Sequence, residues 1–141
     1  MNTSIPGWEK TIASRTRAGI IRDYFPGFNA TSWDYFNLAR LEEFLLSSYA
    51  SLSEVPPQLI EDIQIYISLG LKQKYNGFWV DLSELGSDTQ GMIGIGYPDI
   101  EGLDVCASMV SLPFTLQTGE YWISLFETNR KMRLVNHSEE R

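Results

Sequence analysis

The sequence feature that most constrains the fold is a change in apolar spacing at Asn76-Gly77. Over residues 56–75 apolar side chains recur every three or four positions, which predicts a helix with one buried face. Over residues 78–82 the apolar Phe78, Val80 and Leu82 alternate with Trp79 and Asp81, which is typical of a β-strand with two different faces. Asn followed by Gly favours the left-handed backbone with which many helices end. The chain therefore passes directly from a helix into a strand, and its fold contains both.

Two more helices are predicted from capping signals and apolar spacing. Residues 31–49 carry apolar side chains at helical spacing, and Thr31 followed by Asp34 resembles a capping box at their start. Thr118 is expected to cap a last helix, whose basic residues near the end suit the negative pole of a helix dipole. Helices are thus predicted on both sides of the strand.

Two further strands are predicted over residues 91–96 and 105–112, with an acidic loop over residues 97–104 between them. Connections this short leave no room for the crossover helices that parallel strands need. The predicted fold class is therefore α+β, with N-terminal helices, a short antiparallel β-meander of about three or four strands, and a C-terminal helix. Trp79 and Asp81 share one face of the first strand, so Trp79 needs a helix or an interface to cover it.

A chain of 141 residues is long enough for one domain and too short for two ordinary ones. We therefore expect residues 1–141 to form a single domain. Residues 1–30 should be irregular or short-helical because Pro and Gly interrupt them, with a turn held by aromatic side chains at residues 24–28. Residues 136–141 are expected to fray.

The charge of the chain is unevenly placed. The formal net charge is −7, but residues 24–127 hold three basic and fourteen acidic side chains, which gives −11 for this span. A field of that sign repels nucleic acid, whose binding depends on Lys and Arg at the phosphates, and it repels anionic membrane surfaces. It attracts basic proteins and speeds their association. The expected partner is therefore a basic protein, and neither nucleic acid nor a membrane.

Few residues are available for familiar catalytic or cofactor chemistry. The chain has one histidine, His137, close to its last residue, and one cysteine, Cys106, which lies in an apolar stretch and is expected to be a buried small side chain rather than a nucleophile. Gly91, Gly94 and Gly96 reverse the spacing of a dinucleotide-binding loop, and no GK[ST] sequence occurs. We therefore expect no catalytic activity, no cofactor and no metal.

The expected compartment is the cytoplasm. A single cysteine excludes an internal disulfide framework and fits a reducing environment. No apolar run approaches the roughly 20 residues needed to cross a bilayer. Residues 1–11 also lack the basic-then-apolar pattern of a secretory signal.

The most suggestive group of side chains is acidic and lies around the predicted connections between strands. It permits three functional interpretations: a carboxylate pair for acid–base catalysis, a Ca²⁺ site, or an acidic surface that binds a partner. The Ca²⁺ interpretation lacks the D-x-[DN]-x-[DN]-G loop, and solvated acids without a role remain a fourth possibility. As candidate partner-binding residues we take six acids and one aromatic anchor among them: Asp81, Glu84, Asp88, Tyr97, Asp99, Glu101 and Asp104.

Three short motifs between Ile63 and Phe126 resemble those of small bacterial domains, some of which are immunity proteins. The motifs are Leu69-Gly70…Lys74-Tyr75-Asn76-Gly77, Phe78-Trp79-Val80-Asp81-Leu82 and Leu112-Pro113-Phe114…Gly119-Glu120. The chain thus resembles the immunity proteins of contact-dependent growth inhibition and other polymorphic-toxin systems. This resemblance implies tight, stoichiometric neutralisation of a toxin domain, often a basic nuclease, and carries over no toxin-contact residue.

The leading hypothesis is therefore a non-catalytic cytosolic binding protein that occludes the active site of a basic toxin domain. Two other classes remain open. One is a small enzyme that uses a carboxylate pair within residues 81–104, which would need a deep pocket and one acid of raised pKa. The other is a regulatory or structural module that binds some other partner.

Overall fold

A computed structural model describes the backbone of residues 6–18, 20–85 and 92–139. Over these residues the fold contains six α-helices, two short 3-10 helices and one three-stranded antiparallel sheet, which confirms the α+β class. In chain order the elements are α1 Pro6–Ala18, α2 Ile20–Tyr24, α3 Tyr35–Ser48, η1 Leu52–Glu54, α4 Pro57–Lys74, β1 Phe78–Asp81, η2 Leu82–Leu85, β2 Ile93–Tyr97, β3 Ile100–Val105, α5 Ser108–Leu116 and α6 Tyr121–Glu139.

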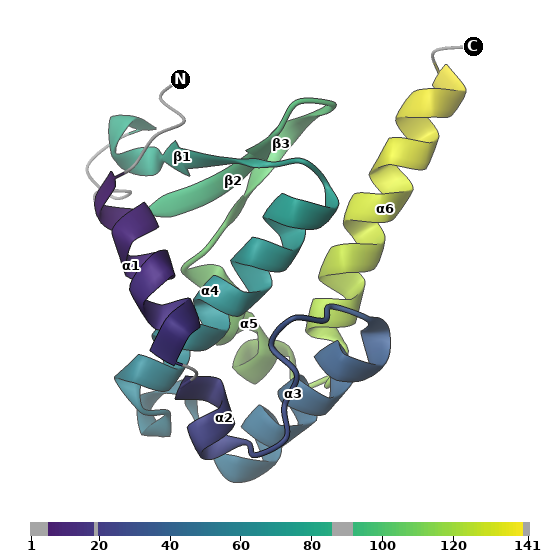
Figure 1. The fold of residues 1–141 in the computed structure, drawn as a ribbon. Helices are drawn as coiled ribbons and strands as arrows, with labels where there is room; N and C mark the ends of the chain where they lie inside the picture. The colour runs from purple at the N-terminus through teal and green to yellow at the C-terminus, as the bar shows by residue number, and fades with distance from the viewer. Residues whose placement is uncertain (1–5, 19, 86–91, 140–141) are drawn as a thin grey trace.

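Helix α4 lies at the centre of the molecule and contributes five of the nineteen residues of the main buried core (Figure 1). It contacts α1, α2, α5 and β2, and α6 packs beside α3 and β3. The predicted helix over residues 56–75 is confirmed, with Pro57 in its first turn. Its end is also as predicted, because Asn76 has a left-handed backbone with φ 57° and the N–H of Gly77 bonds back to the carbonyl of Lys72.

The three strands of the sheet pair in the order β1-β2-β3. The face of the sheet that is turned toward the helices carries both apolar and acidic side chains. Trp79 pairs with Ile95, and both side chains are buried in the main core. Trp79 meets Trp8 of α1 edge-on, with ring centroids 5.7 Å apart. The face that Trp79 shares with Asp81 is thus the one covered by a helix. On the opposite face, Gly96 leaves room for the ring of Phe78, since a Cβ there would lie 2.6 Å from that ring.

The predicted strand over residues 105–112 and the predicted loop over residues 97–104 are wrong. The third strand is β3, so most of the expected loop is strand, and the apolar run after it forms α5. A short apolar run has no period that distinguishes a strand from a helix, and a proline at its end is also typical of the end of a strand. Pro113 instead lies inside α5.

A hydrogen bond from α6 explains how α5 tolerates this proline. In a regular helix the carbonyl of Met109 would accept from the N–H of residue 113, which proline lacks. The indole Nε1–H of Trp122 donates to that carbonyl at 2.7 Å. Trp122 is fully buried, so the contact joins α5 to α6 inside the core.

The N-cap of the helix predicted over residues 31–49 lies three residues later than expected, and the helix runs over Tyr35–Ser48. Asp34, not Thr31, caps α3, because its Oδ1 accepts the N–H of Asn37 at 2.7 Å. This bond holds the pKa of Asp34 below its ordinary value. Trp33 therefore belongs to the preceding loop, where its indole donates to the carbonyl of Tyr66 at 2.7 Å and fills the space left by Gly70.

The two ends of the described chain are helical. Residues 6–18 form α1 and residues 20–24 form α2, and the turn that follows is held by Phe28, which is buried and stacks on Phe25. The backbone of α6 is helical to Glu139, and the fraying expected over residues 136–141 stays a prediction. No Gly or Pro occurs after residue 119, so nothing in the sequence stops this helix.

A buried carboxylate joins α3 to the first turn of α6. Glu42 is fully buried, and its two oxygens accept the backbone N–H groups of Tyr121 and Trp122 at 3.0 and 2.9 Å. Unpaired N–H groups at a helix N-terminus favour an anion, which explains how the core accepts this acid. Burial raises the pKa of Glu42, and the two backbone hydrogen bonds partly oppose that rise.

Candidate partner-binding site

The end of the β2–β3 hairpin faces the second half of α6 across an open groove of about 740 Å³. The hairpin contributes Pro98, Asp99, Ile100 and Glu101, and the helix contributes Thr128, Lys131 and Met132. Ile100 and the 38% exposed Met132 supply apolar surface. Asp99, Glu101 and Lys131 are exposed and supply charge. Two of the predicted partner-binding acids, Asp99 and Glu101, thus lie together in one groove.

Arg133 of α6 fixes one wall of this hairpin groove. Its Nε lies 2.9 Å from Oδ2 of Asp99, and its Nη1 donates to the carbonyl of Asn129 at 2.7 Å. The guanidinium also lies over the rings of Tyr75 and Tyr97, 4.2 and 4.8 Å from their centroids. Because planar guanidinium suits both carboxylates and aromatic faces, Arg133 holds the hairpin end against α6.

Tyr97 and Asp104 form a second, inner link between the hairpin and α6. The hydroxyl of Tyr97 donates to Oδ2 of Asp104 at 2.7 Å, and Asn129 Nδ2 donates to the same oxygen at 3.2 Å. Tyr97 is only 5% exposed, and burial together with the Asp104 carboxylate raises its pKa. In this arrangement the Tyr97 ring is part of the core and is not an exposed anchor for a partner.

The remaining predicted acids lie elsewhere or outside the described residues. Asp81 ends β1, at the opposite edge of the sheet from β3, and its Oδ1 accepts the N–H of Ser83 at 3.0 Å. That bond holds the pKa of Asp81 below its ordinary value. The backbone of Glu84 lies in η2, but its side chain is outside the described part of the structure, as is all of Asp88.

Sequence reasoning missed the half of this site that α6 provides. Asn129 and Arg133 are four residues apart and therefore lie on one face of the helix, toward the hairpin. The sequence signal was present in that spacing. It could not be used without knowing that α6 packs beside β3, because residues 99 and 133 are linked only by the tertiary fold.

Cys106 is buried, as predicted, although it follows β3 rather than lying within a strand. The hydroxyl of Ser68 donates to its Sγ at 3.2 Å. Burial raises the pKa of the thiol to about 11, so Cys106 stays protonated at neutral pH. A protonated, buried thiol is a poor nucleophile.

The described residues offer neither a metal-ligand cluster nor a membrane-spanning helix. Among them no three His, Cys, Asp or Glu side chains are grouped as a metal ion would need. Within the same ranges no helix combines the length and the apolar character required to cross a bilayer.

Comparison with known proteins adds no relative to these observations. The chain matches no protein-family model, no curated protein sequence and no solved structure.

Proposed function

We propose that this chain is a non-catalytic cytoplasmic binding protein that neutralises a basic toxin domain, as immunity proteins do. The observation that carries the proposal is the hairpin groove, in which carboxylates border an apolar floor. A Lys or Arg side chain of a partner fits such a groove, because its methylene groups can pack on Ile100 and Met132 while its charged end meets Glu101, since Asp99 already pairs with Arg133. The resemblance to immunity proteins supplies the specific role.

The charge of the chain supports the same partner. The net charge of −7 favours the approach of basic proteins over a distance of several ångströms. In the proposed complex the carboxylates of the groove take positions that nucleic-acid phosphates would occupy on a basic nuclease. Occlusion of the toxin's active site then follows from binding alone and needs no chemistry by this chain.

A carboxylate-pair enzyme has less support from the described acids. Asp99 is paired with Arg133, and Asp104 accepts from Tyr97 and Asn129. The pKa of Glu42 is raised, but this carboxyl group binds the first turn of α6 in the core. A general acid needs both a raised pKa and access to a substrate.

The proposal predicts a one-to-one complex with the toxin domain encoded beside this chain. We expect calorimetry to give a stoichiometry of one, and we expect the toxin's activity to fall in proportion to the chain added. Purified chain alone should show no nuclease, hydrolase or transferase turnover. Absence of a complex, or toxin activity that persists in it, would contradict the proposed role.

A further inference from the structure

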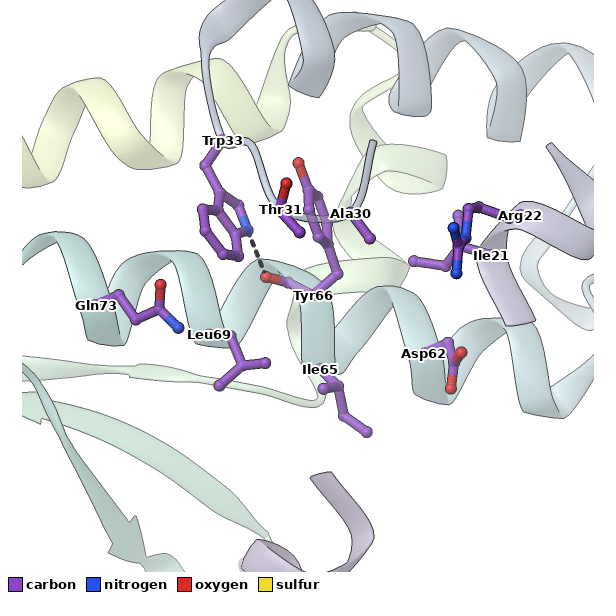
Figure 2. Close-up of a pocket in the computed structure, with 10 residues that line it drawn as sticks. All are labelled: Ile21, Arg22, Ala30, Thr31, Trp33, Asp62, Ile65, Tyr66, Leu69 and Gln73. Atoms are coloured by element: carbon purple, nitrogen blue, oxygen red, sulfur yellow. Dashed lines mark hydrogen bonds between the residues drawn. The ribbon is translucent and has the colours of Figure 1, made fainter. Parts of the chain in front are cut away.

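A second cavity, of about 330 Å³, lies between α4 and the segment that joins α2 to α3 (Figure 2). Its apolar lining comes from Ile21 of α2, from Ile65 and Leu69 of α4, and from the aromatic pair Trp33 and Tyr66. None of the residues that line the hairpin groove lines this cavity. Small-molecule sites in proteins have volumes of this order and are lined mainly by apolar and aromatic side chains.

The aromatic wall of the cavity is held in place by hydrogen bonds and close packing. The Trp33 and Tyr66 rings stack with centroids 5.5 Å apart and an interplanar angle of 19°. The Trp33 indole donates to the Tyr66 carbonyl, and the Tyr66 hydroxyl accepts from Asn37 and donates to the carbonyl of Ser32. A wall fixed in this way loses little freedom when a ligand binds.

The charged groups at the cavity differ in their access to solvent. Arg22 is exposed, and Figure 2 shows its side chain at the α2 end of the cavity. Asp62 also lines the cavity but is only 6% exposed, and its Oδ1 is closed to solvent. A ligand that enters from water therefore meets the guanidinium of Arg22 first. Guanidinium pairs well with a carboxylate.

We propose that this cavity binds a small aromatic carboxylate, with its ring among Trp33, Ile65 and Leu69 and its carboxylate on Arg22. The volume sets the size of the ring system. An apolar cavity of about 150 Å³ holds one benzene, so about 330 Å³ suits a bicyclic aromatic acid with a short side chain. This inference is independent of the partner that binds at the hairpin groove.

The probe for this proposal is 1-naphthylacetate, titrated into the full chain and followed by calorimetry and by the NMR signal of the Trp33 indole N–H. We expect one binding event and a shift of that signal. Arg22→Gln should weaken binding about tenfold, the effect of losing roughly 1.4 kcal/mol of a charge-assisted contact. Lys131→Gln, which also removes one positive charge but lies in the hairpin groove, should leave the affinity unchanged.

Two comparisons decide between this ligand class and others. 1-Naphthylmethylamine has the same ring and the opposite charge, so we expect it to bind at least tenfold more weakly than the acid. Leu69→Trp should fill the cavity and abolish binding. If that variant does not fold, the charge comparisons still stand, because Arg22 is on the surface. Equal affinity for acid and amine, or an Arg22→Gln variant that binds as the parent does, would overturn the proposal.

Discussion

Replacement of Glu42 by Ala is expected to lower the free energy of unfolding by about 3–5 kcal/mol, because it leaves two N–H groups at the start of α6 without an acceptor in the core. For a chain of this length that loss corresponds to a fall in melting temperature of roughly 10–20 °C. Glu42→Gln should cost about half as much, since one amide oxygen can accept only one of the two bonds well. Urea unfolding followed by circular dichroism measures both variants.

The pH dependence gives a second readout for the same residue. Because the folded state raises the pKa of Glu42 above its usual value of 4.5, the folded chain binds this proton more tightly than the unfolded chain. The contribution of Glu42 to stability is therefore largest below pH 4.5 and declines as the pH rises through the folded pKa. The difference in free energy of unfolding between the parent chain and Glu42→Gln should therefore increase as the pH falls from 7 toward 4.5.

Glu43 provides the matched control for these measurements. It is adjacent in sequence and exposed on the same helix. Glu43→Gln should change the free energy of unfolding by no more than about 0.5 kcal/mol, as is usual for surface substitutions. If Glu42→Ala unfolds as the control does, the cap that we assign to α6 does not exist.

Replacement of Trp122 by Ala is expected to lower the free energy of unfolding by about 3–5 kcal/mol, because this side chain is fully buried where α6 packs against α5. Trp122→Phe keeps most of the ring and removes the indole N–H. It should still cost about 1–3 kcal/mol, since the Met109 carbonyl is left without its partner. Thermal and urea unfolding both measure these losses.

Pro113→Ala tests the reason for that cost. Alanine restores the backbone N–H that a helix would direct at the Met109 carbonyl, so the loss caused by Trp122→Phe should be smaller by about 1 kcal/mol in the Pro113→Ala background. The double-mutant cycle isolates this coupling. Strictly additive effects of the two substitutions would show that the restored backbone N–H of residue 113 does not replace the indole N–H at the Met109 carbonyl.

The parts of the fold that the sequence predicts are those whose determinants are local. Helix α4 begins at a proline and ends at Asn76-Gly77, and both signals act on the backbone within one turn. Strand β1 follows directly, although it ends at Asp81 and both Trp79 and Val80, which point to opposite faces, are buried. The period of the apolar residues shows that the fold holds both helices and strands, and the short connections between the strands favour antiparallel pairing and hence the α+β class.

The parts that the sequence does not predict depend on tertiary contacts. The run that forms α5 is mostly apolar and contains Pro113, and a tryptophan in another helix compensates for that proline. Glu42 is one acid among eighteen, and only the position of the α6 N-terminus distinguishes it from solvated ones. Neither relation leaves a periodic signal along the chain.

The sequence predicts only part of the candidate site, because the rest of the site depends on tertiary contacts. Acidic residues near a strand connection pointed to the hairpin groove, where Asp99 and Glu101 lie. The sequence could not show that Asp99 is held by Arg133, or that Tyr97 turns inward to Asp104. Among the described predicted acids, Glu101 is therefore the exposed carboxylate of the groove best suited to a direct test.

The measurement that tests the central claim most directly is the affinity of Glu101→Lys for the basic toxin domain that we propose as the partner, at low and at physiological salt. Asp23→Lys on α2 makes the same change in charge at an exposed position on another element. Both variants should melt near the parent temperature. We expect Glu101→Lys to lose about 2–5 kcal/mol of binding free energy, Asp23→Lys to lose little, and parent association to slow as salt rises. A Glu101→Lys variant that binds as tightly as Asp23→Lys would contradict the assignment of the hairpin groove as the inhibitory surface.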